Sequence, residues 1–239
     1  MISEETAARL RTLLADQLTY RPRADILTQI ADKRVICFVG ATGMGKTTIM
    51  HQLAREDSQF GEFSVFTSRE PRPEDNRARY TYYQHTDESL AGLLNRIEKG
   101  EVLQYNINPF SLLVYGSEVD GYPYAHNLGD VFASSIDGFR QLGFGEVQVF
   151  SVVTDPDSWL QRFNARFPSG NPQREARRLE AISSLEWSLA QTNADHAWVI
   201  NRDGHIGEAT KAITGRHQAK TEAVELAQAC LTAIRELAS

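Results

Sequence analysis

The order of apolar and polar residues along the chain predicts alternating helices and strands. Residues 3–20 carry Leu10, Leu14 and Leu18 at helical spacing, whereas residues 34–39 (RVICFV) form a short β-branched run that is typical of a strand buried on both faces. Further helices are expected after residue 22 and over residues 46–55, 86–99, 155–166, 173–191 and 220–237, and further strands at residues 63–66, 102–105, 131–134, 147–153 and 197–200. This alternation favours a three-layer α/β sandwich with a parallel central sheet.

Composition limits the function classes to which the chain can belong. Its 239 residues, 41% of them hydrophobic, are enough for one main α/β domain with small appendages. The formal net charge of -6 gives no general attraction to a nucleic-acid polymer or to an anionic membrane. The chain has two cysteines, charges spread through residues 1–18 and no long apolar run, so we expect it in the reducing cytoplasm, without a disulfide framework.

A glycine-rich stretch directly follows the first predicted strand. Residues 40–47 (GATGMGKT) satisfy the pattern G-x-x-x-x-G-K-[ST] between a strand and a helix. In this arrangement the glycines let backbone N–H groups surround a phosphate, Lys46 reaches the β and γ oxygens of ATP, and Thr47 holds Mg²⁺. The residues predicted to bind ATP here are Gly40, Thr42, Gly43, Met44, Gly45, Lys46, Thr47 and Thr48. The competing interpretation is a glycine turn that only joins the strand to the helix.

Arginine, proline and tyrosine residues concentrate after the second predicted strand. Arg69 and Arg72 stand three residues apart with a proline between them, and Tyr80 follows. Two fork-shaped guanidinium groups at this spacing can converge on one phosphate dianion, although a solvated basic loop would have the same composition. The run TSREPRP with the following tyrosine resembles the guanylate kinase signature T-T-R-x-P-R-P. The resemblance implies that Arg69, Arg72 and Tyr80 hold the phosphate of an acceptor nucleotide.

Two further segments of the acceptor region are similar to guanylate kinases. Residues 100–104 (GEVLQ) and 114–117 (VYGS) resemble the family's G-E-F-L-E and N-x-Y-G-T/S. The resemblance implies that Tyr115 contacts phosphate, and that Gln104 and Ser117 contact the base.

The resemblance continues toward the C-terminal part of the chain and spans residues 34–203. Arg162, Arg166 and Arg178 resemble the arginines of the family's lid, which neutralise the phosphoryl group during transfer. Arg162 and Arg166 stand one helical turn apart and share a face of the predicted helix, where ordinary surface charges would also stand. Asn201, followed by Asp203, resembles a segment that lies beside the adenine of ATP.

The chain departs from the family mainly where the base is recognised. Gln104 stands where guanylate kinases read guanine N1–H and N2–H with a glutamate, and an amide oxygen can accept from only one of them. Residues 131–137 (VFASSID) replace a D-I-D strand, so that outer support for Mg²⁺ would come from Asp130 or Asp137. Residues 121–124 (GYPY) indicate a rebuilt wall of the acceptor pocket, and Phe167 replaces a lid glycine.

The sequence therefore predicts a kinase with a P-loop NTPase fold, a small acceptor-binding subdomain and a helical lid. We expect an N-terminal helical extension over residues 1–32, a guanylate-kinase-like domain over 33–203 with its acceptor region at 67–117 and its lid at 157–180, and a C-terminal helical extension over 204–239. The expected reaction uses ATP and Mg²⁺ to phosphorylate a nucleoside monophosphate, GMP or dGMP first. The alternatives are another nucleotide or a phosphoribosyl compound as acceptor, and a non-catalytic protein-binding module; the terminal helices could also form a homodimer.

Overall fold

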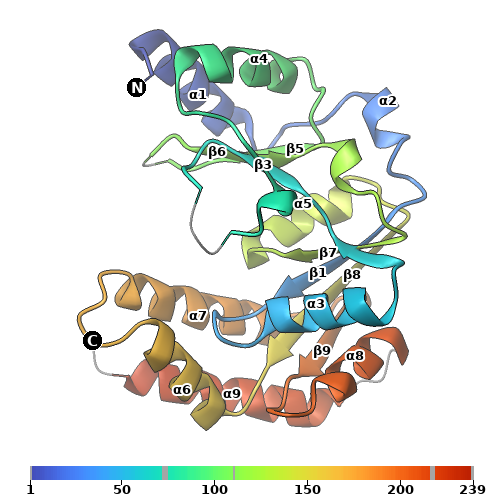
Figure 1. Ribbon diagram of the computed structural model, residues 1–239, viewed down its shortest axis with the longest axis vertical. Coiled ribbons are helices and arrows are strands. Elements are labelled where there is room, and N and C mark those ends of the chain that lie inside the picture. Colours follow the sequence, from blue (N-terminus) through green and yellow to red (C-terminus); the bar gives the residue numbers. More distant parts are fainter. Residues whose placement is uncertain (1, 72–74, 110, 216–218, 238–239) are drawn as a thin grey trace. The chain divides into compact units, whose positions relative to one another are not determined.

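The chain is an α/β protein with a five-stranded all-parallel sheet, a separate mixed four-stranded sheet and several helices (Figure 1). The computed structural model describes residues 2–71, 75–109, 111–215 and 219–237. The chain divides into two compact units. The first comprises Met1–Lys33, Glu62–Asn127 and Arg140–Gly145, and the second comprises Arg34–Gly61, Leu128–Phe139 and Glu146–Ser239.

The four-stranded sheet forms the centre of the first unit. Its strands lie in the order β4-β3-β6-β5, namely β4 (Tyr80–Tyr82), β3 (Val65–Thr67), β6 (Val114–Ser117) and β5 (Gln104–Ile107). Helix α1 (Glu4–Asp16) packs against α4 (Asp87–Glu98) and β5, and α2 (Ala24–Leu27) follows it in the chain. Leu10 of α1 and Leu90 of α4 belong to one hydrophobic cluster with Phe66, Tyr105 and Val114 of the sheet. One face of the sheet is therefore apolar and covered by helices.

The five-stranded sheet belongs to the second unit, apart from Glu62 of one strand and His126 and Asn127 of another, which belong to the first unit. Its strands lie in the order β2-β7-β1-β8-β9, namely β2 (Phe60–Glu62), β7 (His126–Asp130), β1 (Arg34–Val39), β8 (Glu146–Val153) and β9 (His196–Ile200). After Arg34, every residue of β1 is buried, as a central strand requires. The helices of this unit are α3 (Lys46–Glu56), α5 (Ile136–Gln141), α6 (Pro156–Arg166), α7 (Arg174–Leu189), α8 (Ile206–Gly215) and α9 (Lys220–Glu236). Helix α3 packs against α8, and α9 packs against α6 and α7.

Several predicted elements are confirmed, including β1 at its predicted bounds. Helix α4 begins after Thr86, whose hydroxyl accepts the Ser89 N–H, and α6 begins after Asp155, whose carboxylate accepts the Ser158 N–H at 2.8 Å. Such caps satisfy N–H groups that the helix itself leaves without acceptors. None of the helices among the described residues has the length and apolar character needed to cross a bilayer.

Other predicted boundaries are wrong. No strand forms at residues 131–134, because β7 ends at Asp130. The Val131 N–H still donates to Phe38 O, but Phe132 is 65% exposed and a 3₁₀ turn follows at Ala133–Ser135. The strand expected at 63–66 is two short strands, because the Ser64 N–H turns away to Gly121 O. Helix α8 lies within the predicted C-terminal helical extension, but no separate helix was predicted there, because its glycines and threonines have low helix propensity.

Candidate functional site

The glycine-rich loop joins β1 to α3 in the second unit. Gly43 and Gly45 have φ angles of 89° and 90°, in the left-handed region that favours glycine, and Gly45 is the N-cap residue of α3. A Cβ atom on Gly45 would lie 2.0 Å from Nδ2 of Asn201. The loop therefore requires glycine at this position both for its backbone angle and for the close approach of Asn201.

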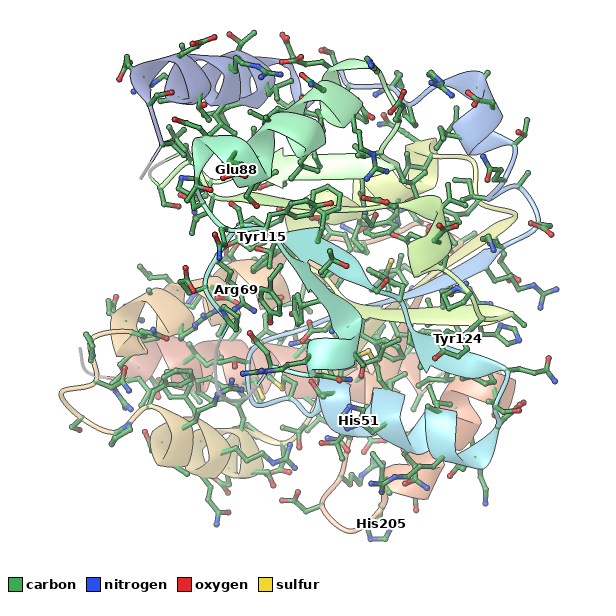
Figure 2. All side chains as sticks on the ribbon, turned by 45° about the horizontal axis from the view of Figure 1, so that its top comes forward. His51, Arg69, Glu88, Tyr115, Tyr124 and His205 are labelled. Atoms are coloured by element: carbon green, nitrogen blue, oxygen red, sulfur yellow. The ribbon has the colours of Figure 1, made fainter. Side chains whose placement is uncertain are left out.

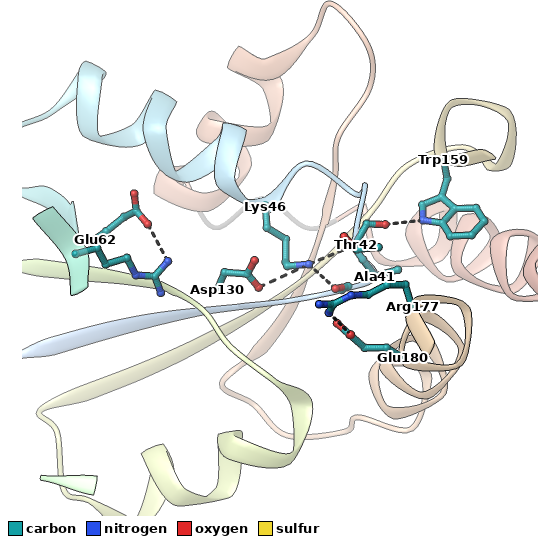
Figure 3. A network of polar contacts seen from close by, with 10 residues as sticks. Ala41, Thr42, Lys46, Glu62, Asp130, Trp159, Arg177 and Glu180 are labelled. Carbon is teal, nitrogen blue, oxygen red and sulfur yellow. Dashed lines mark hydrogen bonds and ion pairs between the residues drawn. The ribbon is translucent and has the colours of Figure 1, made fainter. Parts of the chain in front are cut away.

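Every backbone carbonyl from residue 40 to residue 44 accepts a hydrogen bond from a side chain. Lys46 Nζ donates to Gly40 O (2.5 Å) and Ala41 O (3.1 Å), and Trp159 Nε1 donates to Thr42 O (2.9 Å); Figure 3 shows Lys46 and Trp159 at the loop. Arg162 Nη1 donates to Gly43 O (3.1 Å), and Asn201 Nδ2 donates to Met44 O (2.9 Å). In the described part of the chain, the backbone N–H groups of Gly43, Gly45 and Lys46 have no acceptor. The loop thus presents unpaired donors at the N-terminus of α3, where an anion is stabilised.

Beside the loop lie the ammonium group of Lys46, the carboxylate of Asp130 and the hydroxyl of Thr47. The Lys46 side chain is 9% exposed, and its ammonium group lies 3.6 Å from Oδ1 of Asp130, the last residue of β7 beside β1. Thr47 is exposed, and its hydroxyl has no hydrogen-bond partner among the described residues. A hydroxyl and a carboxylate are hard oxygen ligands that suit Mg²⁺. Asp137, the other predicted substitute, lies in α5 instead. No group of three or more His, Cys, Asp or Glu side chains in the described ranges could hold a metal ion.

Of the three predicted lid arginines, Arg162 contacts the loop. Besides Gly43 O, its guanidinium group binds Asp203, which also accepts from the Ser158 hydroxyl. The hydrogen bond from Arg162, followed by the one from Ser158, holds the pKa of Asp203 below its usual value. The guanidinium group of Arg166 lies over the ring of Phe167, 5.6 Å from its centroid.

Arg178, the third predicted lid residue, has other partners. Its guanidinium group binds both carboxylate oxygens of Glu175, at 2.8 and 2.7 Å, and Ile234 O of α9 at 3.4 Å. Hydrogen bonding to Glu175 raises the pKa of Arg178. Its described contacts therefore connect α7 to α9, and none of them is with the glycine loop. The neighbouring Arg177 binds Glu180 at 2.6 Å (Figure 3).

The predicted acceptor residues lie in the first unit, and strand register places most of them on one face of its sheet. Gln104 pairs with Ser117, Asn106 pairs with Tyr115, and Tyr115 pairs with Thr67 of β3. Thr67 in turn pairs with Tyr82 of β4, and Val65 pairs with Tyr80. Paired residues share a face, so these side chains lie opposite the apolar face that α1 and α4 cover. This set, together with Arg69, which follows β3, and with Asp75, which binds Arg69 and Tyr82, is called the polar face below.

Arg69, labelled in Figure 2, follows β3 and is held by an internal carboxylate. Its Nη1 and Nη2 donate to the two oxygens of Asp75 at 2.7 and 2.8 Å, and the Tyr82 hydroxyl donates to Asp75 at 2.6 Å. The Arg69 and Asp75 side chains are 10% and 7% exposed. The guanidinium carbon also lies 5.1 Å from the centroid of the Tyr80 ring. Hydrogen bonding to Asp75 raises the pKa of Arg69, and burial followed by the bond to Asp75 raises that of Tyr82.

The remaining predicted acceptor residues differ in whether their side chains are open to a ligand. Arg72 lies outside the described residues. Ser117 is fully buried, and its hydroxyl accepts from the Tyr122 hydroxyl at 2.9 Å. Gln104 and Tyr115 are half-buried, and within the described ranges their side chains have no hydrogen-bond partner.

Four residues that the sequence did not assign to a site are important here. Trp159 supports the glycine loop, Asp75 holds Arg69, Tyr122 binds Ser117, and Asn106 stands opposite Tyr115. Asp75 could have been suspected, because it is an acidic residue within an arginine-rich segment. The other three contacts depend on tertiary packing or strand register and have no local signal.

No family model matches this chain, and no curated protein is significantly similar to it in sequence.

Proposed function

We propose that the chain is a kinase of the P-loop NTPase fold that transfers the γ-phosphoryl group of ATP to a phosphorylated small molecule. The observation that carries this proposal is the glycine loop: side chains bind the carbonyls of residues 40–44, while the N–H groups of Gly43, Gly45 and Lys46 have no acceptor among the described residues. The loop follows the carboxyl end of the central parallel strand β1, where α/β sheets bind ligands. Its sequence pattern with Lys46 and Thr47 supports a triphosphate rather than a simple anion.

The residues around the loop suit ATP with Mg²⁺. Thr47 and Asp130 offer the oxygen groups that would hold the metal, which when bound neutralises charge on the phosphate oxygens. Lys46 would turn its ammonium group from the loop carbonyls to the β and γ oxygens. Arg162 stands at Gly43, close enough to the loop to stabilise charge on the transferring group. Helices α6 and α7, which carry Arg162, Arg166 and Arg178, would form the lid.

The polar face is proposed to hold the acceptor. Arg69, Arg72, Tyr80 and Tyr115 would bind the acceptor phosphate, as the resemblance to guanylate kinases implies. An oxygen of this phosphate forms the new bond to the γ phosphorus, while the bond from the γ phosphorus to the β–γ bridging oxygen breaks and its electron pair leaves with ADP. Because the attacking oxygen is already ionised at neutral pH, the reaction requires no protein base.

The test is an assay of ADP formation from Mg-ATP against a panel of GMP, dGMP, AMP, CMP, UMP, dTMP and ribose phosphates. We expect at least one acceptor to raise ADP formation far above the rate without acceptor, and the phosphorylated product to appear in equal amount. Binding of Mg-ATP is measured separately by calorimetry. ATP hydrolysis that no acceptor accelerates would indicate an ATPase rather than a kinase. The absence of Mg-ATP binding would contradict the proposal as a whole.

A further inference from the structure

Three hydrogen-bond donors of the polar face converge on one carboxylate. Nη1 and Nη2 of Arg69 donate to the two oxygens of Asp75 at 2.7 and 2.8 Å, and the Tyr82 hydroxyl donates to Oδ2 of Asp75 at 2.6 Å. The two guanidinium bonds form the parallel fork that arginine also makes with a phosphate group. The Asp75 carboxylate therefore occupies a site whose donors suit a phosphate group equally well.

Other contacts hold the Arg69 guanidinium group independently of Asp75. Its Nη1 also donates to Glu70 O at 2.9 Å, and its carbon lies 5.1 Å from the centroid of the Tyr80 ring and 5.9 Å from that of the Tyr82 ring. Both rings belong to β4, whose pairing with β3 fixes them beside Arg69. Contacts between a cation and aromatic rings stabilise the cation without using its N–H groups. The donors of the site are therefore preorganised for an anion, whichever anion they bind.

The site requires an anion, but this anion need not be Asp75. The Arg69 and Asp75 side chains are 10% and 7% exposed, and a nearly buried guanidinium group without a counter-ion is strongly destabilising. A phosphate dianion carries more negative charge than a carboxylate and has additional accepting oxygens. The three residues that follow Asp75, residues 76–78, are exposed, so water lies close to a displaced carboxylate. Exchange of one anion for another thus keeps Arg69 neutralised throughout.

Resting on the proposed function, we infer that Asp75 occupies the site of the acceptor phosphate, and that Arg69 and Tyr82 release its carboxylate and bind a phosphate dianion in its place. The resemblance to guanylate kinases assigns Arg69 and Tyr80 to the phosphate and gives no role to Asp75 or Tyr82. The exchange also makes a phosphorylated acceptor necessary, because an uncharged sugar or nucleoside would leave the guanidinium group without a counter-ion. The internal carboxylate competes with the acceptor and weakens its binding.

The experiment uses inorganic phosphate as the probe and compares Asp75→Asn with the wild type. An asparagine is uncharged, and its amide has one accepting oxygen for the two guanidinium donors. Asp75→Asn should therefore be less stable than the wild type in chloride and yet bind phosphate about tenfold more tightly. Melting temperatures in phosphate and in chloride at equal ionic strength, with calorimetry, measure the two effects. A variant that does not fold in chloride should yield folded chain when phosphate is present.

Three further variants show whether the ion binds at Arg69. The double variant that combines Arg69→Gln with Asp75→Asn lacks the guanidinium group and should respond to phosphate no more than the wild type does. Asp25→Asn breaks a pair whose side chains are 48% and 59% exposed, and it measures the general stabilisation that phosphate gives to a folded protein. Tyr82→Phe, added to Asp75→Asn, removes the hydroxyl donor, keeps the ring and should lower the affinity for phosphate.

The outcomes separate this inference from the proposed function. Phosphate that stabilises Asp75→Asn no more than Asp25→Asn, or that stabilises the double variant as much as the single one, overturns the inference. Asp75→Asn should also lower the KM of any acceptor that supports ADP formation, without changing the KM of Mg-ATP, and an unchanged or raised acceptor KM contradicts the exchange. Failure to bind Mg-ATP contradicts the kinase and leaves the phosphate measurements unaffected.

Discussion

The glycine loop and the polar face each hold a cation, but they hold it in different ways. Lys46 donates to backbone carbonyls of its own loop, with Asp130 at 3.6 Å. Arg69 is bound by a side-chain carboxylate, Asp75, at 2.7 and 2.8 Å in a nearly buried pair. The loop keeps its shape through carbonyl bonds that an anion need not break, whereas the polar face depends on an ion pair. Removing the cation should therefore affect function in the first case, and removing the counter-ion should affect stability in the second.

The largest expected effect is on phosphoryl transfer by Lys46→Ala. Losing a preorganised charge at a phosphoryl group should lower kcat by about 10²–10³-fold. The stability loss should be small, because the carbonyls of Thr42, Gly43 and Met44 keep their donors. Transfer rates and urea denaturation measure the two effects, and Lys211→Ala, at an exposed position of α8, is the control. ATP turnover at the wild-type rate would show that the loop is not the phosphate site.

Asp75→Asn should have the largest effect on stability. It leaves the guanidinium group of Arg69 in a nearly buried site without its counter-ion, which costs about 3 kcal/mol in the free energy of unfolding. The matched control is Asp25→Asn, which breaks the Arg23–Asp25 pair, whose side chains are 48% and 59% exposed. That variant should unfold like the wild type, because exposed pairs contribute little. Equal losses of unfolding free energy in the two variants would show that the Arg69–Asp75 pair contributes no more than an exposed pair.

Gly45→Ala tests how strongly the backbone fixes the loop. The φ angle of 90° costs about 1–3 kcal/mol for a residue with a side chain, and the new Cβ atom would collide with Asn201 at 2.0 Å. Gly170→Ala is the control, because its φ of 84° is similar and no atom lies within 4 Å of its Cβ position. Calorimetric unfolding should show a larger loss for Gly45→Ala, together with weaker ATP binding. If both variants lose the same stability, the contact with Asn201 does not constrain the loop.

The same contrast explains how much the sequence could predict. β1, the loop and α3 were predicted at or near their observed bounds, because a buried strand, three glycines and a lysine are local signals. Trp159 was not predicted as a donor to the loop, and Asn201 was predicted to lie beside the adenine of ATP rather than to bind Met44 O, because these contacts join residues 117 and 157 positions apart in the chain. On the polar face, Gln104 and Tyr115 were predicted from motifs, but Asn106 follows from strand register alone. The closure of Ser117 by Tyr122 likewise depends on the packing of a segment with no regular periodicity.

The smallest expected effect concerns Asp155, which caps α6, the helix that brings Trp159 and Arg162 to the loop. Asp155→Ala should lower the free energy of unfolding by about 1 kcal/mol, because the Ser158 N–H loses its acceptor. Asp155→Asn keeps an accepting oxygen and should be close to the wild type at neutral pH. Urea denaturation at pH 7 measures both. A loss from Asp155→Asn as large as that from Asp155→Ala would assign the effect to charge rather than to the cap.

The pH dependence of stability, compared between the wild type and Asp155→Asn, tests the role of the Asp155 charge. The hydrogen bond from the Ser158 N–H holds the pKa of Asp155 below its usual value, so the unfolded chain takes up this proton at a higher pH than the folded chain. Its stabilising contribution is therefore present at neutral pH and is lost as the pH falls below about 4, through the folded pKa. Asp155→Asn cannot titrate, so the wild type, which is close to this variant at pH 7, should become less stable than the variant as the pH falls. A difference that does not change between pH 7 and pH 3 would contradict the lowered pKa.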